Sequence, residues 1–220
     1  MSSAKERLGR LLTLAAEARW APLARELADI VLDWPPDFSF SMREPLTALL
    51  DQFLRGADRA TRAELARRIG GHPELPLHLL NELYLVAPAP VRREILLRNE
   101  LEPDDAEAAR IAAADATALL AIARQPAGRD FASALEAAFG IPHHTAREIL
   151  DDTSGEPLAV LCRGAGIDRA IYSAVVLLKG PSAIPLSIFD TVPQHAAERL
   201  VRHWRARARP SETEAIKAAE

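Results

Sequence analysis

The fold of this chain is decided by a stretch that occurs twice, first as Ala60-Thr61-Arg62-Ala63-Glu64-Leu65-Ala66-Arg67-Arg68 and, thirty residues later, as Pro90-Val91-Arg92-Arg93-Glu94-Ile95-Leu96-Leu97-Arg98. The copies match arginine with arginine, glutamate with glutamate and Leu65 with Ile95. A repeat period of about 20–50 residues is typical of stacked helical units that are each too small to bury an apolar face alone. The pattern predicts a helical scaffold and names no reaction.

Composition favours the same fold class. The 220 residues include 42 Ala and 31 Leu, whereas Val and Ile together number only 20. Ala and Leu are the best apolar helix formers, and β-branched residues are the ones that favour strands. We therefore expect an all-α fold whose core includes Leu65, Ile95, Leu135, Leu161, Ile167 and Val175.

A second repeat, with an offset of 26 residues, occupies the C-terminal half. Leu135–Pro142 corresponds to Leu161–Asp168, and each copy has the pattern of a helix, a tight turn at a glycine and a second helix. Gly140 and Gly166 fall just past the end of a helix, where a positive φ suits glycine. The isoleucine that follows each glycine is predicted to enter the core.

Composition also bears on the location of the chain. No apolar run approaches the roughly 18 residues that cross a bilayer, and the first ten residues lack a signal-peptide core. The single cysteine, Cys162, cannot form an internal disulfide, as expected in a reducing compartment. The net charge of −4 is not that of a protein that coats nucleic acid. We expect a cytoplasmic protein without a transmembrane segment.

Two segments resemble known families. Ala89-Pro90-Val91-Arg92-Arg93-Glu94-Ile95-Leu96 is similar to the second helix of a HEAT-type repeat, in which Pro and Val-Arg open the helix. The run Gly155–Ile167, preceded by Ile149-Leu150, resembles the alphaproteobacterial proteins grouped as domain of unknown function 2336, over roughly residues 60–180. The resemblance implies a HEAT-like α-α superhelix, a stack of helical hairpins. It brings no catalytic residues, because that family is functionally uncharacterised.

The expected organisation follows from the helix-breaking residues. We predict N-terminal helices over 1–57, HEAT-like helical repeats over 58–125, and C-terminal helical repeats with a capping helix over 129–209. A flexible tail covers 210–220, and Gln125–Gly128 is the best candidate for a boundary within one continuous structural unit.

Four arginines recur in phase in the two copies of the first repeat. Arg62 matches Arg92 and Arg68 matches Arg98, so a regular stack would align each pair in a row on one solvated surface. The simpler, structural interpretation is a solvent-exposed face on which Arg68 pairs with Glu64 and Arg98 pairs with Glu94, each four residues earlier. The functional one is a binding surface for an acidic protein partner, with a melting temperature unaffected by replacement of Arg62 and Arg92.

Aromatic residues gather at one place. Trp34, Phe38 and Phe40 surround Pro35-Pro36 in a chain with 11 aromatics. These rings either anchor a partner or fill the gap between the second and third helices.

Two features carry an alternative function, binding to nucleic acid or to an anionic surface. The helix–glycine–isoleucine–helix units resemble helix-turn-helix motifs, although Asp168–Leu178 is too apolar for a recognition helix. The last helix places Arg199, Arg202, Arg205 and Arg209 opposite an apolar face that includes Trp204. Its plainer interpretation is a terminal cap whose arginines are solvated.

No motif indicates catalysis, a metal or a cofactor. The six histidines form no His-Glu-x-x-His motif, and no glycine-rich phosphate loop occurs. His143 and His144 are adjacent, so on a helix they point about 100° apart and do not readily share a metal. We predict a non-enzymatic protein-interaction module or regulator that binds a protein partner, with a homodimer as a further option.

Overall fold

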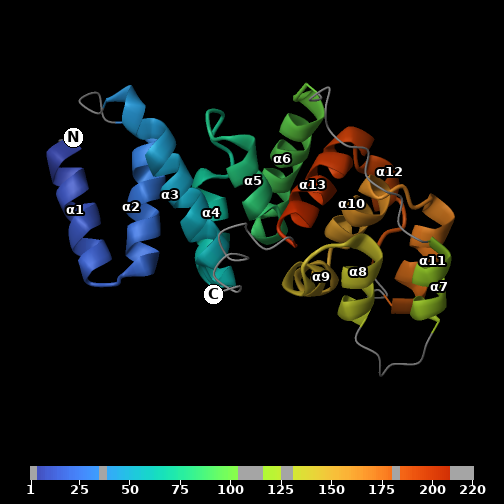
Figure 1. Ribbon diagram of the computed structural model, residues 1–220. Coiled ribbons are helices and arrows are strands. Elements are labelled where there is room, and N and C mark those ends of the chain that lie inside the picture. Colours follow the sequence, from blue (N-terminus) through green and yellow to red (C-terminus); the bar gives the residue numbers. More distant parts are fainter. Residues whose placement is uncertain (1–3, 35–38, 104–115, 125–130, 180–183, 209–220) are drawn as a thin grey trace. The chain divides into compact units, whose positions relative to one another are not determined.

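The computed structural model describes residues 4–34, 39–103, 116–124, 131–179 and 184–208 (Figure 1). Every element in these ranges is a helix and none is a strand, which confirms the predicted all-α fold class. The chain divides into two compact units, residues 1–95 and 96–220. The HEAT-like superhelical stacking stays a prediction.

The first unit is a series of helices, each of which packs on the next helix along the chain or on the one after it. Helix α1 packs on α2, α2 packs on α3 and α4, and both α3 and α4 contact α5 (Figure 1). The elements are α1 (Ala4–Ala16), α2 (Trp20–Leu32), the 3-10 turn η1 (Phe40–Met42), α3 (Arg43–Gly56), α4 (Arg59–Ile69), α5 (Leu77–Leu83) and the 3-10 turn η2 (Tyr84–Val86).

Apolar residues at helical spacing form the core of this unit. In α2 the side chains of Leu23, Leu27, Ile30 and Val31 share one face and are all buried. Leu50 and Leu54 of α3 and Leu65 and Ile69 of α4 are fully buried as well. These apolar faces pack each helix against its neighbours, and the opposite faces are exposed to solvent.

The two copies of the first repeat fall on α4 and on α6 (Ala89–Leu101), a helix that contains the division between the units. Leu65 and Ile95 are both buried, as predicted. The two helices approach closely at Gly70, where an added Cβ would lie 2.4 Å from Cγ1 of Val91. The matched residues Leu65 and Ile95 are therefore core residues.

The second unit is built around α10, which contacts α9, α11, α12 and α13. Seven of the nine residues of α10 are buried, among them Leu161 and Cys162. The elements of this unit, besides the end of α6, are α7 (Ala116–Ala123), α8 (Phe131–Phe139), α9 (His143–Leu150), α10 (Glu156–Gly164), α11 (Arg169–Lys179), α12 (Ile188–Thr191) and α13 (Gln194–Ala206).

The glycine turns of the second repeat are as predicted. Gly140 and Gly166 have φ values of +66° and +75°, in the left-handed region that favours glycine. The amide of Ile167 donates to the carbonyl oxygen of Cys162 over 2.9 Å, which closes the end of α10. Ile141 and Ile167 are buried, and Leu135, Leu161 and Val175 complete the confirmed core predictions.

Helix α13 packs along α10 and is held at its start by α6. The amide of Ala196 donates to Oε2 of Glu100 over 2.9 Å, so a carboxylate from α6 satisfies a helix N-terminus whose N-cap, Pro193, makes no side-chain cap bond. The contact with α10 is close because residue 164 is a glycine.

The division of the chain differs from the predicted boundary at Gln125–Gly128, a segment that lies outside the described residues. The units separate instead after Ile95, because α7 packs on α8 and α11 and so belongs to the second unit. The predicted tail over 210–220 also lies outside the described residues.

Candidate partner-binding groove

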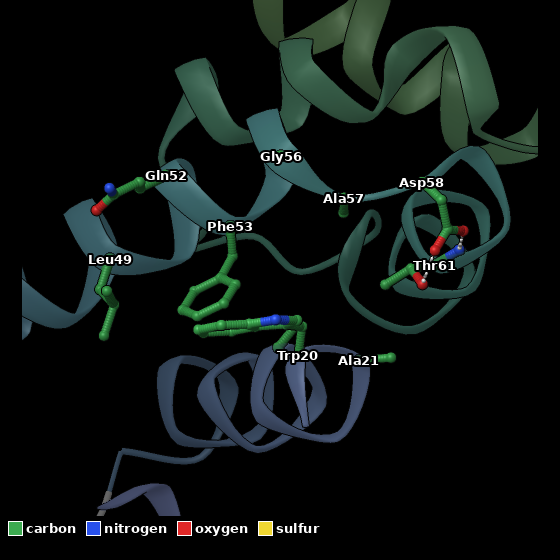
Figure 2. Close-up of a pocket in the computed structure, with 10 residues that line it drawn as sticks. Trp20, Ala21, Leu49, Gln52, Phe53, Gly56, Ala57, Asp58 and Thr61 are labelled. Atoms are coloured by element: carbon green, nitrogen blue, oxygen red, sulfur yellow. Dashed lines mark hydrogen bonds between the residues drawn. The ribbon is translucent and has the colours of Figure 1, made fainter. Parts of the chain in front are cut away.

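The first unit contains a concave groove. It has a volume of about 620 Å³ and runs between α2 and α3 toward the start of α4 (Figure 2). Its lining is mostly apolar and consists of Trp20, Ala21, Ala24, Leu49, Gln52, Phe53, Gly56, Ala57, Asp58 and Thr61. A largely apolar concavity of this size is typical of ligand and partner sites.

Small side chains make the room in this groove. Ala21 and Ala24 of α2 face Gly56 and Ala57, which lie at the end of α3. A Cβ built on Gly56 would meet no atom within 4 Å, so the space beside this glycine is open. The groove is therefore an unfilled gap between packed helices, and larger residues at these positions would occupy it.

An aromatic pair marks one end of the groove. The ring centroids of Trp20 and Phe53 lie 5.7 Å apart at an interplanar angle of 42°, and Leu49 lies beside them (Figure 2). Trp20 is 58 % exposed and Leu49 is 38 % exposed, although both are large apolar residues. Exposed aromatic surface next to a concavity is a feature of binding sites.

Asp58 and Thr61 form the opposite end (Figure 2). Asp58 is the N-cap of α4, and its carboxylate accepts from the amide of Thr61 at 2.9 Å and from its hydroxyl at 3.1 Å. These two hydrogen bonds hold the pKa of Asp58 below its usual value, because they stabilise the ionised carboxylate. The polar side chains at this end of the groove therefore cap the N-terminus of α4.

Two ion pairs join α2, which forms one side of the groove, to α4. Arg25 donates to Glu64 over 2.5 Å, and Arg68 donates to Asp29 over 2.7 Å. The pair with Arg25 lowers the pKa of Glu64. The expected pairing of Arg68 with Glu64 within α4 is therefore wrong, because α2 supplies both partners.

The expectation that Arg62 and Arg92 form an exposed row is also wrong. Both are buried, at 8 % and 7 % exposure, because their faces of α4 and α6 turn into the first unit. Nε of Arg92 donates to the carbonyl oxygen of Tyr84 over 3.1 Å, and its Nη2 donates to that of Leu85 over 3.0 Å. Its guanidinium also lies 5.6 Å from the centroid of the Tyr84 ring. These contacts make Arg92 a structural residue.

The remaining predicted binding residues are spread over the chain. Arg68 is exposed at the end of α4, and Arg98 is half-buried on the other repeat helix, α6. Trp34 is half-buried just after α2. Phe38 and the side chain of Phe40 lie outside the described residues, so the aromatic patch stays a prediction.

The last helix uses its arginines for packing. As predicted, its apolar face, which includes Leu200, Val201 and Trp204, is buried. Arg199 donates to the carbonyl oxygen of Pro103, and Nε of Arg205 donates to that of Phe139 over 2.6 Å. Desolvation lowers the pKa of Arg205, as expected for a half-buried guanidinium. The expectation that the arginines of this helix are solvated is therefore wrong for Arg199 and Arg205, and Arg209 lies outside the described residues.

Two side chains with catalytic potential, Cys162 and His143, are enclosed or paired. Cys162 is fully buried, and burial raises the pKa of its thiol to about 12. His143 pairs with the carboxylate of Glu136, 3.0 Å away on the preceding helix. Over the described ranges, no three His, Cys, Asp or Glu side chains converge as a metal site would require.

The groove was missed in the sequence because its residues look like ordinary helix formers. Leu49 and Phe53 have the same helical spacing as the buried Leu46 and Leu50, but α3 carries a wider apolar face than its core contact covers. One residue in the sequence could have indicated the groove: Trp20, a large apolar ring next to the charged Arg19 at the start of α2.

Comparison with known proteins identifies the family of the chain. No curated protein and no solved structure matches it. A family described as an uncharacterised protein conserved in bacteria, DUF2336, matches residues 52–216. The matched segment includes the groove residues from Gln52 to Thr61 and the second unit up to residue 216. On the strength of this match, over more than half of its length, the chain belongs to the bacterial DUF2336 family.

Proposed function

We propose that the protein is a non-enzymatic interaction module, which binds apolar side chains of a protein partner in the groove between α2 and α3. The observation that carries the proposal is the exposed Trp20, whose ring lies tilted against that of Phe53 at one end of this groove. Tryptophan is enriched among the residues that dominate binding energy at interfaces, and such residues lie beside well-formed pockets. The groove replaces the arginine rows as the expected interaction surface.

The contacts that link α2 to α4 beside the groove support this assignment. Arg25–Glu64 and Arg68–Asp29 tie α2 to α4, and the cap at Asp58 fixes the start of α4. A pre-organised groove loses little conformational entropy when a partner binds. A helical-hairpin array of the HEAT type, which we expect here, presents such grooves between successive helices.

Binding to nucleic acid is a weaker candidate, because the basic residues that would serve it have internal roles. Arg199 and Arg205 bind backbone carbonyl oxygens, and α11 buries Tyr172, Val175 and Val176. A nucleic-acid surface needs cations that are free to neutralise phosphates.

The expected setting of this function is the cytoplasm of a bacterium. Within the part of the chain that the structure describes, no helix combines the length and the apolar character needed to cross a membrane. The occupant of the groove is expected to be a different protein, and a second copy of the chain is the alternative outcome.

Photo-crosslinking in cells tests the proposal. A photoreactive amino acid at Gln52, an exposed groove residue, should give adducts with a protein partner. The adducts should disappear when Gly56→Leu fills the groove and should persist with Gly9→Leu, the same substitution on α1, where nothing lies within 4 Å. Equal adducts in all three proteins would refute the groove as the binding surface, and a self-adduct would indicate a homodimer.

A further inference from the structure

We draw no further inference here: the strongest candidate, the apolar patch at the C-terminal end of α11, where Leu177 and Leu178 are 76 % and 49 % exposed, carries none because nothing in the structure shows what covers it.

Discussion

Gly164 of α10 lies against Ala197 of α13 so closely that an added Cβ would be 2.4 Å from the carbonyl oxygen of Ala197 and 2.6 Å from its carbonyl carbon. Both atoms belong to the backbone, so no rotamer change relieves the contact. The absence of a side chain at residue 164 allows the central helix of the second unit to pack on α13.

The substitution Gly164→Ala should therefore destabilise the second unit. Overpacking of a filled core costs about 1–3 kcal/mol, despite the helix propensity that alanine adds. Urea unfolding followed by circular dichroism measures the loss. Gly9→Ala on α1 is the control and should have no cost, because nothing lies within 4 Å of that position. Equal stability of Gly164→Ala and the original chain would show that the two helices do not pack this closely.

Arg92 is expected to matter for folding. The substitution Arg92→Ala removes the guanidinium that donates to the carbonyl oxygens of Tyr84 and Leu85, at a cost of about 1–3 kcal/mol; the Tyr84 oxygen still accepts from the amide of Ala87. Arg93→Ala removes the adjacent exposed arginine and should change stability by no more than about 0.5 kcal/mol. Thermal unfolding of both variants distinguishes them, and equal melting temperatures would contradict the structural role of Arg92.

Cys162 should be inert in the folded protein. A buried thiol with a pKa near 12 has almost no thiolate at neutral pH, and its sulfur is closed to solvent. Labelling with Ellman's reagent should therefore be slow and should accelerate in urea as the second unit opens. Immediate labelling under native conditions would place Cys162 at the surface.

The start of α4, at the polar end of the groove, should weaken in acid. The pKa of Asp58 is lower in the folded chain than in the unfolded one, so its ionised form stabilises the fold above the unfolded value of about 3.9. That contribution is lost as the pH falls through the folded-state pKa, since a protonated carboxyl is a poorer acceptor for Thr61. Asp58→Asn keeps a capping side chain without the titration, and its stability should vary less below pH about 4. An NMR titration of Asp58 that gives an unshifted pKa would contradict the cap.

Sequence reasoning succeeded where the determinant is local. The turns at Gly140 and Gly166, the burial of Ile167 and the face of α13 that carries Trp204 all follow from residues within a few positions of one another. Glycine after a helix and an apolar stripe are recognisable without knowledge of the neighbours.

It failed where the determinant lies in another helix. Whether Arg92 is exposed depends on the carbonyl groups that η2 presents to α6, and the partner of Glu64 comes from α2. The groove depends on small residues of two helices that face one another, such as Ala21 and Gly56, and in the sequence these are plain helix residues. The position and lining of the groove are therefore determined by packing between helices that are distant in the sequence.

The central claim, that the groove is the interaction surface, is tested most directly by ¹⁹F NMR of the chain labelled with 5-fluorotryptophan. Its three tryptophans report on different parts of the chain, because Trp20 lines the groove, Trp34 belongs to the predicted aromatic patch and Trp204 is buried on α13. Tryptophan-to-phenylalanine substitutions assign the three signals, and spectra are then recorded in buffer and in extract of the native host. The account predicts that the extract shifts or broadens the signal of Trp20 and that Gly56→Leu abolishes the change. A Trp20 signal that is the same in extract and buffer, whether or not Trp34 or Trp204 responds, would contradict it.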